Sequence, residues 1–170
     1  MVTSEPYYSE LKILLEHYQN GRYEDAEKLA LILTDKFQTH PFGWKVLGAV
    51  LNQTGRISEG LIACQKSVAL APENAEAHYN LGVTLKELGR LEEAEESYRQ
   101  AIALKPDFTE ALLNRGRLLF DKGEFEIALR DFDLCNTKNS RARALSSLYA
   151  LGRIEDIYKR IETIDKKEEK

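Results

Sequence analysis

Several kinds of residue and motif are scarce in this sequence, and each absence narrows the class of protein. Two cysteines, Cys64 and Cys135, are too few for a disulfide framework, and we expect both to be buried free thiols. Four prolines and no glycine- or serine-rich run leave no flexible linker. Every apolar run is far shorter than the ~20 residues of a membrane span. The first residues do not resemble a secretory signal, so we expect a cytoplasmic protein without membrane association.

Motifs that carry chemistry are missing too. The chain has no glycine-rich phosphate loop, no dinucleotide-binding pattern, no HExxH and no GxSxG. Its three histidines are far apart in the sequence and form no metal-binding pattern. The formal net charge of −4 lacks the basic excess typical of nucleic-acid binding. We therefore expect a protein that is not an enzyme, holds no metal or cofactor, and does not bind nucleic acid.

What the sequence does contain is an internal repeat. The turn glycines Gly21, Gly55, Gly89 and Gly123 are each 34 residues apart (55 − 21, 89 − 55 and 123 − 89). On both sides of each glycine, apolar residues recur at the three- and four-residue spacing of an amphipathic helix. A fifth turn follows at Gly152, only 29 residues later (152 − 123), so the fourth repeat is expected to be shorter. A fixed period of this size is typical of stacked helical hairpins.

The third repeat carries the clearest motif, which reads His78-x-x-Leu81-Gly82-x-x-Leu85, then Ala94-x-x-x-Tyr98, then Pro106. This motif resembles the tetratricopeptide repeat family, including its bacterial members, whose pattern is Trp-x-x-Leu-Gly-x-x-Tyr, Ala-x-x-x-Phe and Pro. The resemblance implies an all-α, right-handed superhelical stack of about five helix-turn-helix repeats, or about ten helices, in one domain. The expected repeats are approximately 7–40, 41–74, 75–108, 109–137 and 138–165, with a frayed tail at 166–170.

The apolar periodicity predicts where the helices begin and end. Three glycines, Gly48, Gly82 and Gly116, fall inside predicted helices, where glycine costs ~1 kcal/mol relative to alanine. We expect this cost to be offset by close approach of the second helix of each hairpin, at Gly60, Ala94 and Ala128. The predicted ranges are 6–19, a helix following Gly21, 41–53, 57–70, 75–87, 91–104, 109–121, 125–134, 139–150 and 154–165.

The resemblance also implies a binding surface, because the first helices of such repeats line a concave groove. Aromatic, amide and cationic side chains along these helices suit an extended peptide, since amides pair with its backbone and rings cover its side chains. The carboxylate clamp that chaperone adaptors of this family use matches at only two of five positions. The candidate groove residues are Lys45, Asn52, Tyr79, Asn80, Lys86, Asn114, Arg117 and Phe120.

Asn80 and Asn114 are one period apart (114 − 80 = 34). They resemble two rungs of the asparagine ladder that holds peptide backbones in the repeats of O-linked N-acetylglucosamine transferases. The equivalent positions of the other repeats are not asparagine. An equally good interpretation is that both side chains bond only solvent or a neighbouring helix.

Two classes of function fit these observations. The first is a non-catalytic interaction scaffold that binds a protein or peptide in its concave groove. The second is a recruiting module of a larger microbial enzyme of the glycosyltransferase, sulfotransferase or iron-dependent oxygenase type. Self-association through the groove or the terminal helices is a further possibility, and the sequence does not identify the partner.

Overall fold

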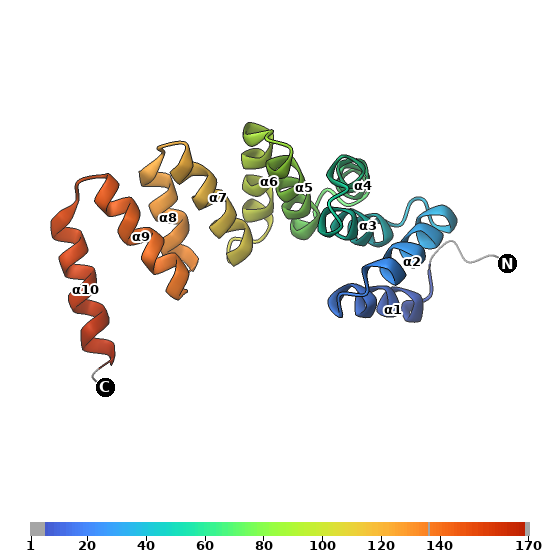
Figure 1. The fold of residues 1–170 in the computed structure, drawn as a ribbon, viewed down its shortest axis with the longest axis horizontal. Coiled ribbons are helices and arrows are strands. Elements are labelled where there is room, and N and C mark those ends of the chain that lie inside the picture. Colours follow the sequence, from blue (N-terminus) through green and yellow to red (C-terminus); the bar gives the residue numbers. More distant parts are fainter. Residues whose placement is uncertain (1–5, 136, 169–170) are drawn as a thin grey trace. The chain divides into compact units, whose positions relative to one another are not determined.

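The computed structural model describes residues 6–135 and 137–168, and within these residues every regular element is an α-helix (Figure 1). The described part of the chain contains ten helices, so the predicted all-α class of helix-turn-helix repeats is confirmed. None of them is long and apolar enough to cross a bilayer. The helices are α1 (Tyr8–Gln19), α2 (Tyr23–Lys36), α3 (Pro41–Gln53), α4 (Ile57–Leu70), α5 (Ala75–Glu87), α6 (Leu91–Leu104), α7 (Thr109–Asp121), α8 (Phe125–Cys135), α9 (Lys138–Ala150) and α10 (Ile154–Glu168).

The two terminal helices differ from their predicted ranges. Helix α1 begins at Tyr8, not at Pro6, because Tyr7 is extended (φ −66°, ψ 142°) and its N–H donates a 3.1 Å hydrogen bond to the side chain of Glu10. Helix α10 continues to Glu168, so residues 166–168 are helical where a frayed tail was predicted. The remainder of the predicted tail, 169–170, lies outside the described residues.

Glycine ends the first helix of every hairpin. Each turn needs one residue in the left-handed region, which only glycine occupies without a steric penalty. The backbone N–H of the following residue then caps the helix, as where Arg90 donates to the carbonyl of Leu85 over 2.9 Å. The φ angles are 70° at Gly21, 78° at Gly55, 73° at Gly89, 83° at Gly123 and 68° at Gly152.

The fourth repeat is shortened where α8 passes into α9. Helix α8 ends at Cys135, and α9 already begins at Lys138. The N–H of Ser140 donates to the hydroxyl of Thr137 over 3.1 Å, and the N–H of Thr137 donates to the hydroxyl of Ser140 over 2.9 Å. This reciprocal cap satisfies two backbone donors at the helix start and allows α9 to begin without a longer connection.

The glycines inside the first helices make the close approach that the sequence predicted. A Cβ atom added to Gly82 would lie 2.7 Å from the ring of Tyr98 and 3.2 Å from the carbonyl oxygen of Ala94. A Cβ atom added to Gly116 would lie 2.7 Å from the ring of Phe132. The space beside Gly82 and Gly116 is therefore filled by a ring of the second helix, and the backbone of Ala94 also approaches Gly82. The predicted Ala128 is not among the nearest neighbours of Gly116, and Gly48 faces the thiol of Cys64 and the carbonyl oxygen of Gly60.

The first position of the motif has a common structural role although its residue type changes. The indole N–H of Trp44 donates to the carbonyl of Gln38 over 3.0 Å, six residues earlier. His78 stands one period later, and its Nε2 forms a 2.8 Å hydrogen bond with the carbonyl of Pro72, again six residues earlier. His78 thus replaces Trp44 in the hydrogen bond that joins the start of the helix to the preceding loop.

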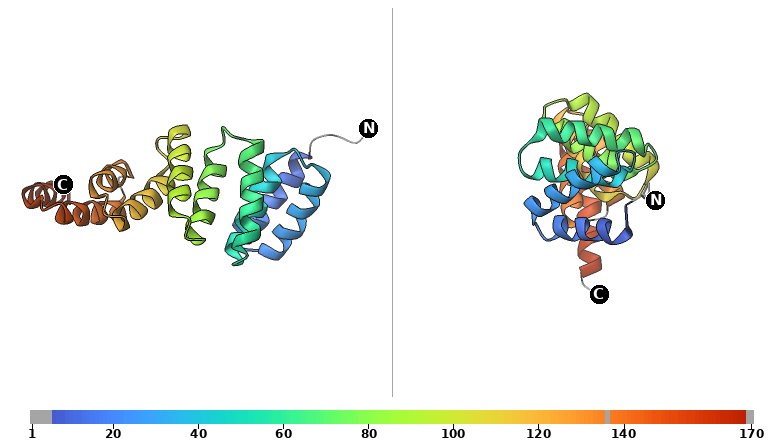
Figure 2. Two further views of the ribbon diagram at one scale, coloured as in Figure 1. Left: turned by 90° about the horizontal axis from the view of Figure 1, so that it is seen from above. Right: turned by 90° about the vertical axis from the view of Figure 1, so that its right-hand side faces the viewer.

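The chain divides into two compact units, residues 1–104 (unit 1) and 105–170 (unit 2). The single domain expected from the sequence, with its five approximate repeats, stays a prediction. In unit 1, α3 packs with α4 and α5 with α6, and the blue-to-green helices lie side by side in Figure 2. One core cluster of unit 1 is formed by Leu14, Ala26, Ala30, Leu33, Val46, Leu47, Val50, Leu51 and Ala63. In unit 2 the cluster is formed by Leu119, Ala128, Leu129, Phe132, Ala144 and Leu148.

Candidate functional site

The first helices of unit 1 carry five of the predicted groove residues, on α3 and α5. Lys45 of α3 forms an ion pair with Glu76 of α5, which brings these two faces together. The same Lys45 ammonium lies 5.2 Å from the ring centroid of Phe42. Lys45 is therefore already held by two neighbours and is mostly buried, with 17% of its side chain exposed. We call the five predicted residues the unit 1 face: Lys45 and Asn52 on α3, and Tyr79, Asn80 and Lys86 on α5.

Asn52 is used inside the protein. Its amide donates a 2.6 Å hydrogen bond to the hydroxyl of Thr84, which is fully buried on α5. Thr84 in turn donates to the backbone carbonyl of Asn80 over 2.8 Å. The side-chain oxygen of Asn52 is also buried, and it has no hydrogen-bond partner among the described residues. The structure thus places Asn52 between two hairpins, where its amide group contacts α5 and its side-chain oxygen is not exposed to solvent.

The other residues of the unit 1 face are more accessible. Asn80 is half-buried, and its side chain makes no hydrogen bond with any described residue. Tyr79 beside it is half-buried, with its ring centroid 6.1 Å from that of Tyr98. Lys86 is exposed and lies 3.9 Å from Glu87, a separation at which the ion pair contributes little. The side chain of Asn80 therefore offers a donor and an acceptor, and Tyr79 and Lys86 lie on the same helix.

Unit 2 carries the remaining three predicted residues, all half-buried on α7. Phe120 packs edge-on against Phe125, with centroids 5.1 Å apart and an interplanar angle of 66°. The Nε of Arg117 is buried and has no hydrogen-bond partner in the described part of the chain. Asn114 belongs to unit 2 and Asn80 to unit 1, so the asparagine ladder stays a prediction.

The acidic residues at the starts of second helices are structural. Arg90 donates two hydrogen bonds of 2.6 Å to Glu93, and these bonds lower the pKa of the Glu93 carboxyl. Arg56 bonds Glu59 in the same way and lowers its pKa. Both carboxylates thus stay ionised and paired, a state that suits a helix N-terminus better than proton transfer. Among residues 6–135 and 137–168, no group of three potential metal ligands comes together.

The two cysteines are free and buried, as the sequence predicted. Burial raises the pKa of the Cys64 thiol above its ordinary value. Burial also raises the pKa of the Cys135 thiol, to about 11, and the nearby carboxylates of Asp131 and Glu110 add to the shift. A raised pKa keeps both thiols protonated and poorly nucleophilic at neutral pH.

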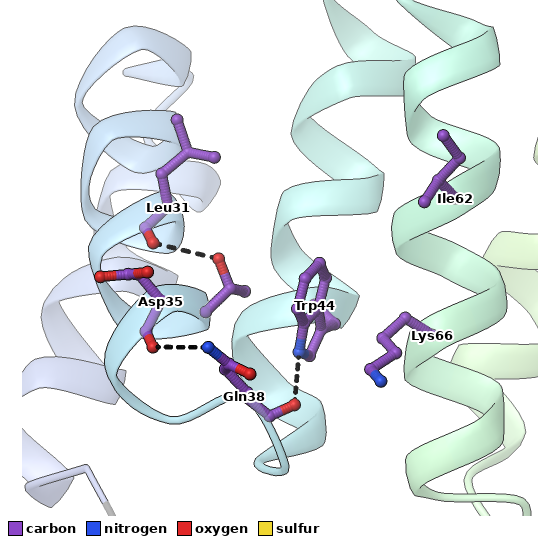
Figure 3. A pocket seen from close by; sticks show the side chains of 7 residues that line it. Leu31, Asp35, Gln38, Trp44, Ile62 and Lys66 are labelled. Carbon is purple, nitrogen blue, oxygen red and sulfur yellow. Dashed lines mark hydrogen bonds between the residues drawn. The ribbon is translucent and has the colours of Figure 1, made fainter.

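A pocket of about 510 Å³ lies between α2, α3 and α4, and sequence reasoning missed it (Figure 3). Trp44 stands at its centre, and Leu31 of α2 and Ile62 of α4 are 50% and 66% exposed. These two apolar residues fall outside the core stripe of their helices, which is the only sequence signal of the pocket. Its lining residues are Leu31, Thr34, Asp35, Gln38, Trp44, Ile62 and Lys66.

The repeated helical hairpins and their glycine turns define a helix-hairpin repeat protein. Two family profiles, both described as tetratricopeptide repeat, match residues 11–75 and 75–108. Together these matches span more than half of the 170-residue chain. The chain belongs to the tetratricopeptide repeat family. No protein of curated function matches it in sequence.

Solved structures share the fold at low sequence identity. A crystal structure of MamA protein matches with a TM-score of 0.79 and 18% identity over 94% of this chain and 90% of that one. TTC0263, a thermophilic TPR protein in Thermus thermophilus, matches with a TM-score of 0.68 and 20% identity over 82% and 80%. A structure of Naa15/Naa10 bound to HypK-THB matches with a TM-score of 0.74 and 14% identity, over 94% of this chain but 25% of that one. At these identities the likeness concerns the fold.

Proposed function

We propose that this protein is a non-catalytic scaffold that holds extended segments of partner proteins on the faces of its first helices. The observation that carries the proposal is Asn80, whose partly exposed amide makes no hydrogen bond with any described residue. An asparagine amide both donates and accepts, and so pairs with the backbone of an extended peptide. Tyr79 next to it in sequence supplies an apolar surface, and Lys86 further along α5 supplies a cation for the side chains of the partner.

The chemistry of the chain favours a protein partner over a nucleic acid. The net charge of −4 gives no general attraction for phosphates. The stacked repeats of this family form an extended surface, which suits an extended peptide because its backbone also repeats at a regular spacing. We place the protein in the cytoplasm, with no cofactor and no catalytic group of its own.

The second candidate is a recruiting module within a larger microbial enzyme. In the Naa15/Naa10 structure this chain matches 25% of a longer chain, so a stretch of this size can be one part of a larger protein. The nucleotide sequence that follows codon 170 separates the two candidates. An in-frame catalytic domain would favour the module, and a stop codon directly after the region would favour the free scaffold.

The scaffold proposal is tested by capture of a partner on immobilised protein from the native cell, followed by its identification and by calorimetry with the purified partner. The variant Asn80→Ala/Asn114→Ala should lose capture while its circular dichroism stays unchanged. Asn20→Ala, an exposed asparagine at the end of α1, is the matched control and should capture normally. Equal capture by the double variant would reject the role of these asparagines. Light scattering over a concentration series tests self-association, which a constant monomer mass would exclude.

A further inference from the structure

Two arginines on the first helices of unit 2 have no acidic partner among the residues that the structure describes. Arg117 of α7 and Arg143 of α9 are both half-buried, and the Nε atom of each is buried without a hydrogen-bond partner there. Neither side chain forms an ion pair or a side-chain hydrogen bond with any described residue. Leaving a buried donor of this kind without an acceptor costs about 1–3 kcal/mol.

Other arginines of unit 2 are paired in a way that Arg117 and Arg143 are not. Arg115 makes two hydrogen bonds, of 2.8 and 2.6 Å, to Asp131 in the core. Arg160 of α10 makes two bonds to Asp133 of α8. Acidic partners are thus available in this unit, and the chain uses them elsewhere. Because both side chains are partly exposed although Nε is buried, an acceptor from outside the chain can pair only with the other guanidinium nitrogens of Arg117 and Arg143.

The surroundings of the two arginines suit a peptide. Leu113 and Phe120 flank Arg117 on α7, and both pack against the core cluster that α9 completes with Ala144 and Leu148. Helices α7 and α9 therefore both contribute residues to one core cluster. We define the unit 2 face by the first-helix positions Leu113, Asn114, Arg117 and Phe120 of α7 and Asn139, Arg143, Ser146 and Tyr149 of α9.

The charge of the unit 2 face changes sign along α7. Glu110, an exposed acid, lies at the start of α7, seven residues (117 − 110) before Arg117. Tyr149, 73% exposed, lies near the end of α9. Negative charge on a ligand is repelled at the start of α7 and attracted toward its second half. The acidic side chains of a ligand are therefore placed toward Arg117 and away from the start of α7.

We propose that the unit 2 face binds an acidic segment of a partner protein, with internal Asp or Glu carboxylates on Arg117 and Arg143. This proposal rests on the scaffold function proposed above and specifies the chemistry of its partner. A guanidinium group donates two parallel hydrogen bonds to one carboxylate, which gives both affinity and orientation. Leu113 and Phe120 cover the apolar side chains that alternate with the acids along an extended chain.

The test uses the whole protein and a short peptide of alternating glutamate and leucine with both ends blocked, measured by isothermal titration calorimetry. A peptide with glutamine in place of glutamate should bind at least about tenfold more weakly, because charged hydrogen bonds are lost. Arg117→Gln and Arg143→Gln should each weaken the glutamate peptide about tenfold. Arg117→Lys should recover only part of the affinity, since it keeps the charge and loses the paired geometry. Arg130→Gln, an exposed arginine of α8, is the matched control and should change nothing.

Several outcomes would overturn the proposal. Equal binding of the glutamate and glutamine peptides would do so, as would full affinity in the Arg117→Gln/Arg143→Gln variant with unchanged circular dichroism. Tighter binding of single-stranded DNA, at the same arginines, would assign the face to phosphates instead. If the captured partner binds the double arginine variant normally, this inference fails and the scaffold function stands. If no partner is captured by any form of the protein, the scaffold function fails first.

Discussion

The amide of Asn52 on α3 donates a hydrogen bond of 2.6 Å to the hydroxyl of Thr84 on α5, and so joins two consecutive hairpins of unit 1. The thiol of Cys64 on α4 lies 3.4 Å from the same hydroxyl, which makes Thr84 the centre of a small polar network. Three helices thus meet at one buried oxygen atom. Polar groups in such a network fix the relative register of the helices, because each loses its partner when they slide.

Replacing Thr84 by valine should lower the free energy of unfolding by about 1–3 kcal/mol, since the isosteric side chain leaves the Asn52 amide without its acceptor. Urea denaturation followed by circular dichroism measures the change. The variant Asn52→Ala/Thr84→Val should lose less than the sum of the two single variants, because the two residues act as a pair. Additive losses would show that the hydrogen bond does not couple them.

Gly82→Leu should lower the thermal midpoint by several degrees. Any Cβ at this position lies 2.7 Å from the ring of Tyr98, and overpacking of a core costs about 1–3 kcal/mol. Differential scanning calorimetry provides the midpoint. Glu92→Leu, at an exposed position of α6, is the control for adding a leucine to a helix surface. An unchanged midpoint in Gly82→Leu would refute the close approach of α5 and α6 at this glycine.

Asp131→Asn should destabilise unit 2 strongly. The Asp131 side chain is 2% exposed and receives both hydrogen bonds from Arg115, which is 17% exposed. Breaking one partner of a buried ion pair leaves an uncompensated charge and costs about 3–5 kcal/mol. The joint variant Arg115→Met/Asp131→Leu should be more stable than Asp131→Asn in urea denaturation. The reverse order would mean that the pair contributes more than its desolvation costs.

The stability of the protein should fall on the alkaline side through Cys135. Its folded-state pKa is raised to about 11, so the folded protein holds this proton more tightly than the unfolded chain. This contribution is complete below the ordinary thiol pKa and is lost as the pH rises toward about 11. Urea denaturation of wild type and Cys135→Ala at a series of pH values measures the difference between them. A gap that does not change over this pH range would contradict the shift.

The thiols should also react slowly with iodoacetamide at neutral pH, because both are buried and protonated in the folded protein. Mass spectrometry of Cys64→Ala and Cys135→Ala assigns the modified site over time. Unfolding in urea should accelerate the reaction of both residues. Rapid modification of the folded protein would show that its interior opens locally.

The fold followed from the sequence because the local signals agree with each other. Gly55 and Gly89 set the turns, and the 34-residue spacing places the helices between them without knowledge of the tertiary structure. The exceptions lie where a side chain overrides the pattern. Thr137 caps α9 through Ser140, and Tyr7 with Glu10 delays the start of α1. Such caps depend on atomic geometry that a repeat pattern does not contain.

The candidate site was less predictable, because register shows which face a residue occupies but not which neighbour it meets. Lys45 and Asn52 stand at groove positions, yet one pairs with Glu76 and the other with Thr84. Arg117 stands at an equally ordinary position and has no partner in the described residues. The pocket at Trp44 was not predicted because its lining residues come mostly from three consecutive helices and meet only in the folded chain.

The single tryptophan of the chain lies in unit 1, at the pocket between α2, α3 and α4. Its intrinsic fluorescence therefore reports on unit 1 alone, whereas the far-ultraviolet helix signal sums over both units. Coincident transitions of the two signals would reveal one cooperative array, and separated transitions would reveal that the halves melt one after the other. Trp44 is thus a natural fluorescent probe of how far cooperative unfolding extends along the repeats.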